Sequence, residues 1–336
     1  MTRNLSDVNV GGFHMSAKIA DRYSLGQVTT IDTLPDDILL EIFSFYVAMK
    51  LNAGAWRTLI QVCHRWRGVV FVSPRRLDVR LVCSGRTRVA NVLAAWPTLP
   101  LLVLRDSGSG LSRREGADNI IAALRHKTHV CQIELNGHSS HLLRKIAGVM
   151  QESFPVLTHL EIRLLDDAES AVAFPDELLG GSAPSLRSCT LKSIAFPGIW
   201  KLLLTADRLV DLCLERIPSY TYISSEELAA NFLSALPHLK KLTLRFQCRR
   251  PRESIQSQPP DARIVLPSLT YFWVHGDCEY IEDLCSRVDV PNLGWFRFTF
   301  FTTVFHTPQI HNFFDRTEKY RGHGRMPLDY MTGRYT

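Results

Sequence analysis

The hydrophobic pattern of the chain changes its period once, from a helical to a strand-like spacing. Between Ile38 and Val70, apolar side chains recur at intervals of three to four residues, which is typical of amphipathic helices. Pro35 and two aspartates stand just before this stretch and favour a helix start. Beyond Leu77, apolar and polar residues alternate in short runs, which predicts β-strands with one buried face. We therefore expect a small helical segment followed by a longer strand-rich region.

An internal repeat of the form L-x-x-L-x-L, with conservative replacements, organises the strand-rich region. Eight copies begin 23 to 31 residues apart, at Leu99, Val130, Leu157, Leu186, Leu209, Leu239, Leu269 and Leu293. In six copies a proline stands two positions earlier, where it would end a helix and start an extended segment. Such units cannot bury their apolar face singly, so they must stack. The pattern predicts an irregular leucine-rich-repeat solenoid with a ladder of parallel strands.

These patterns predict an α/β fold built from four segments. We expect a disordered tail at residues 1–30, a small all-α domain at 31–75, the solenoid at 76–320 and a second tail at 321–336. Within the solenoid, residues 249–263 have no period and contain several prolines and glutamines, which predicts a long inserted loop.

Composition narrows the class of protein without naming a partner. The 336 residues are 46% hydrophobic, as in soluble globular proteins, and the net charge of +6 is too small to indicate nucleic-acid binding without a concentrated patch. The first 30 residues lack the apolar core of a secretory signal, and the uncharged stretch from Phe298 to Phe314 is too polar to span a bilayer. Eight cysteines without a C-x-x-C pair indicate reduced thiols, so we expect an intracellular protein, cytoplasmic, nuclear or both.

The segment from Leu34 to Pro74 resembles an F-box. The resemblance depends on Leu-Pro followed by an acidic residue, on an apolar helical stripe, and on a closing L-x-x-V-C-x-x-W element. The residues concerned are Leu34, Pro35, Ile38, Leu39, Ile42, Phe43, Leu59, Val62, Cys63 and Trp66. The chain departs from the family between Val47 and Ala55, where F-boxes often have a Leu/Asp-rich turn. Over about residues 31 to 320 the chain looks like fungal F-box proteins with degenerate leucine-rich repeats.

This resemblance implies a non-enzymatic substrate receptor of a Skp/cullin/F-box ubiquitin ligase. The ten residues named above are then the candidates for binding the Skp adaptor, although some of them must hold the F-box together. Through the adaptor the chain would join a cullin and its RING subunit, while the repeats bind an unidentified target protein. The alternatives are a Skp-binding or repeat-based scaffold outside a cullin complex, and, less favoured, RNA binding by the basic segment from Arg245 to Arg252.

Strand alternation predicts where a target would bind. If Leu160 and Ile162 point into the core, the residues between and beside them point to the outer, concave face of the ladder. The same offset places an aromatic and basic group near the C-terminal end, of the residue types that dominate interface hot spots. The candidates for binding the target are Arg245, Tyr271, Trp273, Trp295 and Arg297. The alternative is that a C-terminal segment folds over these aromatic residues.

Two other features of the sequence affect this interpretation. In the first repeat unit the same offset exposes Leu101 and Val103, so we expect the concave face to be covered there. The histidines and cysteine between His126 and His141 have spacings that match no standard zinc site. We expect no catalytic residue, metal or cofactor.

Overall fold

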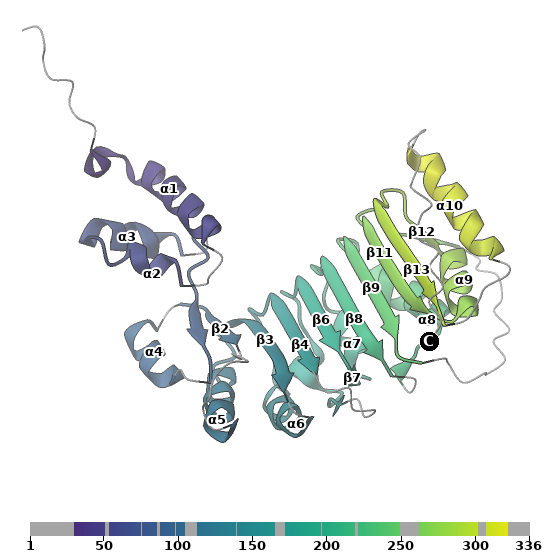
Figure 1. Ribbon diagram of the computed structural model, residues 1–336, viewed down its shortest axis with the longest axis horizontal. Coiled ribbons are helices and arrows are strands. Elements are labelled where there is room, and N and C mark those ends of the chain that lie inside the picture. Colours follow the sequence, from purple (N-terminus) through teal and green to yellow (C-terminus); the bar gives the residue numbers. More distant parts are fainter. Residues whose placement is uncertain are drawn as a thin grey trace, which may run out of the picture. The chain divides into compact units, whose positions relative to one another are not determined.

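The computed structural model of the chain divides into two units, Met1–Leu77 and Asp78–Thr336 (Figure 1). The structure describes residues 30–50, 54–74, 76–85, 88–97, 99–104, 113–138, 140–164, 172–195, 197–218, 221–248, 262–301 and 307–321. All but one residue of each predicted tail, and nearly all of the predicted loop insertion at 249–263, lie outside the described residues. None of the helices in these ranges is long and apolar enough to cross a membrane.

The first unit is helical, as its sequence pattern predicts. A 3-10 turn, η1 (Ile31–Thr33), precedes the helices α1 (Asp36–Met49), α2 (Trp56–Leu59) and α3 (His64–Val72). Pro35 is the N-cap residue of α1, and two aspartates occupy the first turn, where they complement the positive end of the helix dipole. The core contains Leu39 and Phe43 of α1, and the Phe43 ring lies 4.6 Å from that of Trp66 in α3. Because the core draws on α1, α2 and α3, the short helices depend on one another for stability.

The second unit contains one large parallel sheet in which the strands lie side by side in chain order (Figure 1). Nine of the described strands form it: β1 (Leu81–Cys83), β2 (Leu101–Leu104), β3 (Val130–His138), β4 (His159–Leu164), β6 (Ser188–Lys192), β8 (Asp211–Ile217), β9 (Lys241–Phe246), β11 (Tyr271–Gly276) and β13 (Trp295–Phe300). Apart from β1, the strands of this sheet are the eight that the L-x-x-L-x-L pattern predicts. The parallel ladder of the expected α/β fold is thus confirmed, and β1 extends it by one strand.

Short helices and minor strand pairs connect the ladder strands. The helices are α4 (Val89–Ala95), α5 (Arg113–Leu124), α6 (Ser140–Val149), α7 (Ile199–Leu203), α8 (Ser225–Glu227), α9 (Cys278–Arg287) and α10 (Pro308–Arg321), with the further turns η2 (Leu178–Gly181), η4 (Leu228–Phe232) and η5 (Leu233–Ala235). The minor pairs join β5 (Val172–Ala173) to β7 (Ile194–Ala195) and β10 (Ile264–Val265) to β12 (Val288–Asp289). The irregular connections accord with the irregular spacing of the repeat.

The register of the sheet places equivalent apolar residues of successive strands side by side. One row consists of Leu160, Cys189, Leu212, Leu242, Phe272 and Phe296, and the next row consists of Ile162, Leu191, Leu214, Leu244, Val274 and Phe298. All of these except the half-buried Phe296 are buried. The intervening residues point the other way, to what we call the open face, which carries Glu161, Cys213 and Trp273.

The first repeat unit is displaced by one residue from the predicted phase. Val103, not Leu102, pairs with Ile133, because the register shifts at an irregularity between Leu101 and Leu102. The expectation that Leu101 and Val103 lie on the outer face is therefore wrong, since both are fully buried and share the core positions. A one-residue slip reverses every side chain of a strand, so a bulge here changes the face that each residue presents.

Helix α10 covers the apolar side of the last strands. Phe313 is fully buried with its ring 6.1 Å from that of Phe298, and Phe314 lies 4.3 Å from Phe296. The carboxylate of Glu282 in α9 accepts hydrogen bonds from the backbone N–H groups of Gln309 and Ile310, which satisfies the first turn of α10. This helix provides the cover that the terminal unit of a stacked array requires.

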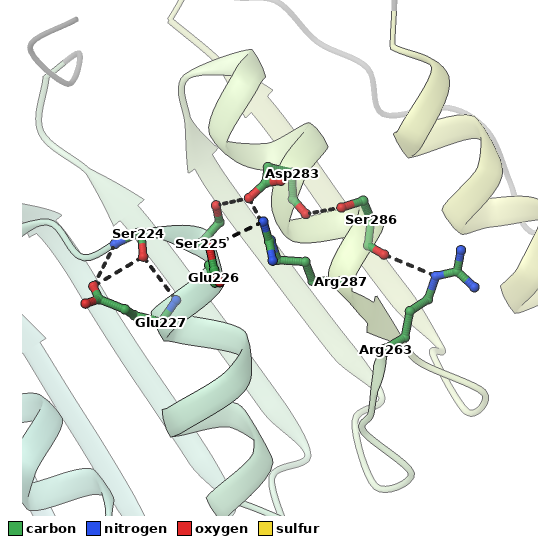
Figure 2. Close-up of polar contacts among 8 residues, drawn as sticks. All are labelled: Ser224, Ser225, Glu226, Glu227, Arg263, Asp283, Ser286 and Arg287. Atoms are coloured by element: carbon green, nitrogen blue, oxygen red, sulfur yellow. Dashed lines mark hydrogen bonds and ion pairs between the residues drawn. The ribbon is translucent and has the colours of Figure 1, made fainter. Parts of the chain in front are cut away.

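A polar cluster joins α8 to α9 (Figure 2). At the start of α8, Ser224 and Glu227 form a capping box, and the next hydroxyl, that of Ser225, donates to the carboxylate of Asp283 in α9. The same carboxylate accepts from Nε of Arg287 at 2.8 Å. Arg287 is only 6% exposed, so its charge depends on this partner more than on solvent.

We expect the two carboxylates near Arg287 to contribute unequally to stability. Asp283→Asn removes the charge that balances a buried guanidinium and should lower the free energy of unfolding by about 3 kcal/mol. Glu226→Gln removes the other carboxylate, which is 67% exposed and 3.7 Å from Arg287, and should lower it by less than about 1 kcal/mol. Urea denaturation of the full chain followed by circular dichroism compares the two variants. Equal losses of unfolding free energy in the two variants would show that the burial of Asp283 does not make its ion pair with Arg287 stronger.

Candidate protein-binding surfaces

Helix α1 presents an apolar stripe to solvent. Its members follow one another at intervals of four, three and four residues, so they lie on one side of the helix. They are Ile38 (43% exposed), Ile42 (41%), Phe45 (69%) and Met49 (83%), and we call them the α1 stripe. Leu39 and Phe43 lie on the opposite side and fill the core. A contiguous row of large apolar side chains that is not used by the core is typical of a binding surface.

The structure sorts the ten candidates for adaptor binding into core and surface residues. Leu39, Phe43 and Leu59 are buried and hold the helices together, while Leu34 and Trp66 are half-buried. The exposed candidates are Pro35, Ile38, Ile42, Val62 and Cys63. Cys63 has a local role as well, because it is the N-cap residue of α3 and its Sγ accepts from the backbone N–H of Trp66.

Sequence analysis missed two members of the α1 stripe, Phe45 and Met49. Both continue the three- and four-residue spacing from Ile42, so the signal was present in the sequence. The predicted candidates on this helix instead end at Phe43, and α1 continues to Met49. These two residues are the most exposed members of the stripe.

Arg65 of α3 fixes the segment that leads into α1. Its guanidinium donates to the carboxylate of Asp36 and to the backbone carbonyls of Asp32 and Leu34. A planar guanidinium with several donors can hold three acceptors at fixed angles. Arg65 therefore positions the exposed Pro35 at the start of the stripe.

Comparison with known proteins finds a family match for the helical segment that contains the α1 stripe. The F-box-like family matches residues 31–84, which include the whole helical segment and strand β1. The chain thus carries an F-box-like domain, and F-box domains typically bind the Skp adaptor. No curated protein matches the chain, and the family match does not extend to the rest of the sheet.

The second surface lies on the open face at the C-terminal end of the sheet. Tyr271 and Trp295 occupy paired positions on β11 and β13, and their rings stack 4.1 Å apart at an angle of 9°. Trp273 lies two residues along β11, with the guanidinium carbons of Arg245 and Arg297 at 4.8 Å and 5.2 Å from its ring centroid. The structure thus brings all five predicted target-binding residues together.

The alternative expected from the sequence was a C-terminal segment folded over this aromatic and basic group. Helix α10, the described helix of that segment, packs on the other side of the sheet. Its phenylalanines pack against Phe272, Phe296 and Phe298, which alternate with the open-face residues and point to the core side. Trp295 retains 37% exposure. Of the described residues after β13, Phe301 alone has a ring contact on this face, edge-on to His275 at 4.7 Å.

Burial and neighbouring charges shift several pKa values on the open face. Burial, and then the nearby charge of Arg245, lowers the pKa of His275, so its imidazole is neutral at pH 7. Its Nδ1 lies 2.7 Å from the hydroxyl of Thr299. Burial, and then the charge of Glu215, raises the pKa of the Cys213 thiol to about 12. The positive charge of the second surface therefore belongs to the arginines.

The described residues contain no group of three or more His, Cys, Asp or Glu side chains that could hold a metal ion. His129 and Cys131, which belong to the histidine-rich stretch, instead contact the backbone carbonyls of Pro97 and Leu101. These contacts tie neighbouring repeat units together, so the two residues have a structural role here.

Phe43 and Phe45 offer a matched test of which side of α1 is core. Phe43 is 1% exposed, and Phe43→Ala should destabilise the helical unit by about 3 to 5 kcal/mol. Phe45→Ala should change its stability by less than about 0.5 kcal/mol. Hydrogen–deuterium exchange of the full chain reports the protection of α1 amides separately from the sheet. Loss of protection in the Phe45 variant would place that side chain in the core.

Proposed function

We propose that this chain is a non-enzymatic substrate receptor of a Skp/cullin/F-box ubiquitin ligase. The F-box-like domain binds the Skp adaptor, and the large sheet binds a target protein. The observation that carries the proposal is the α1 stripe, which lies within the matched F-box-like segment and stays exposed in the isolated chain. The eight free cysteines accord with the reducing intracellular compartments in which such ligases act.

We interpret the second unit as a degenerate leucine-rich-repeat solenoid. Support comes from the sequential order of its parallel strands and from the recurrence of L-x-x-L-x-L in register. Repeat arrays of this kind offer an extended strand-lined surface, and here that surface carries stacked aromatic residues beside arginines. Tyrosine, tryptophan and arginine are the residue types that contribute most to interface hot spots.

The receptor accelerates ubiquitin transfer by holding the target near the conjugating enzyme, and it takes no part in the bond chemistry. Holding a target on the same assembly as a charged ubiquitin-conjugating enzyme raises the effective concentration of target lysines near the reactive thioester. No catalytic residue of this chain is required for that effect.

Co-expression with a Skp adaptor tests the proposal directly. A 1:1 complex on size-exclusion chromatography that also retains cullin is the expected result. An adaptor complex that never retains cullin would favour the alternative of a Skp-binding scaffold. A chain that ignores the adaptor would refute the F-box assignment.

The α1 stripe should dominate adaptor binding. The double variant Ile38→Asp/Ile42→Asp places two charges in the apolar contact and should weaken adaptor binding by about thirtyfold or more. The matched control is Val156→Asp/Leu204→Asp, which makes the same exchange at two exposed apolar residues of the second unit and should bind normally. Isothermal titration with purified adaptor measures both, and equal weakening would remove the stripe from the interface.

A further inference from the structure

The arginine and tryptophan cluster on β9, β11 and β13 has hydrogen-bond donors without acceptors. Nε of Arg245, Nε of Arg297 and Nε1 of Trp273 are buried, and none has a hydrogen-bond partner in the described part of the chain. A buried donor without a partner destabilises a protein by about 1 to 3 kcal/mol, so three in one place require an explanation. The three residues lie on neighbouring strands, at register positions that belong to the open face.

The charges around this cluster are also unbalanced. On the open face, the carboxylates of Glu161, Asp211 and Glu215 already pair with Arg163, Lys241 and Arg245. Arg297 makes no ion pair with any residue that the structure describes. It is only half-exposed, and with Arg245 it places a second positive charge around the ring of Trp273. The two guanidinium groups flank Trp273 from β9 and β13, so an anion bound in this patch would offset the repulsion between their charges.

We propose that Arg245, Trp273 and Arg297 bind an oxyanion, a carboxylate or a phosphate, on an acidic segment of the protein that the sheet captures. This inference rests on the proposed function and names the chemical class of its target. The guanidinium forks supply paired donors that match the geometry of either oxyanion. Trp273 holds both guanidinium planes in place by cation–π contact.

The stacked pair of Tyr271 and Trp295 indicates which side chains of the target lie beside the oxyanion. The two rings occupy the same face, two residues away from the arginine cluster along the strands. Trp295 is exposed and provides a flat apolar surface. An acidic residue flanked by aromatic residues therefore fits the surface better than an acidic residue alone.

Labelled heptapeptides of the form Gly-Ser-Phe-X-Phe-Ser-Gly test the proposal by fluorescence anisotropy with the full chain. The residue X is phosphoserine, glutamate or glutamine. We expect binding when X carries an oxyanion and at least roughly tenfold weaker binding when X is glutamine. A stronger signal for phosphoserine or for glutamate identifies the source of the oxyanion. Equal binding of all three peptides, or no binding of either acidic peptide at about 1 mM, overturns the proposal.

Substitutions then distinguish a built site from general attraction. Arg297→Gln should weaken binding of the acidic peptides by roughly tenfold or more, and Arg297→Lys should restore only part of the affinity, because lysine keeps the charge without the fork. The matched control is Lys192→Gln, which removes one positive charge from the same face on β6 and should change the affinity less than about twofold. An equal effect of Lys192→Gln would refute a specific site.

The adaptor assay separates failure of this inference from failure of the proposed function. A chain that binds adaptor and cullin but no acidic peptide keeps its function as a receptor and loses this site. A chain that binds acidic peptides but no adaptor keeps the site and loses the ligase assignment. Because Arg297 lies in the second unit, the folding of its variants is checked separately, by urea denaturation followed by circular dichroism.

Discussion

In-register pairing of parallel strands is the constraint on which the large unit depends. Within the sheet, each strand pairs only with the strands beside it, so the core depends on the alignment of equivalent apolar residues such as Leu212, Leu242 and Phe272. The end of such an array would leave an apolar row without cover. Helix α10 supplies this cover with Phe313 and Phe314, and Glu282 secures its first turn. The terminal helix is therefore part of the same core.

The same register also creates the aromatic and basic surface. Because the inward residues of β11 and β13 are paired, the outward residues between them are paired too: Tyr271 with Trp295 and Trp273 with Arg297. Stacking of two rings on adjacent strands stabilises the sheet. Placing Arg297 and Arg245 around the same Trp273 ring has the opposite effect, since no described residue balances the charge of Arg297. A pairing that opposes stability is a reason to look for a ligand.

Local signals explain what could be predicted from the sequence. The proline before six of the eight L-x-x-L-x-L units and the alternation within the units act over a few residues, so the sequence alone could predict eight strands and the face that carries Trp273. The first unit failed because a bulge near Leu101 changes the phase, and periodicity does not encode a bulge. Strand β1 is too short to show a period. The unpartnered donors of Arg297 and Trp273 depend on three strands at once, so the sequence alone could not reveal them.

The two surfaces would bind their partners by different physical interactions. The α1 stripe buries apolar area, and that contribution depends little on moderate salt. The arginine cluster acts through charge, which ions screen within about 10 Å at 0.1 M salt. A substitution of Phe45 changes apolar burial but no charge, and Arg297 lies in the other unit. A substitution on one surface therefore leaves the binding energy of the other surface unchanged. Under the proposed function, the sequence of the sheet can therefore change to bind a different target while the helices continue to bind the same adaptor.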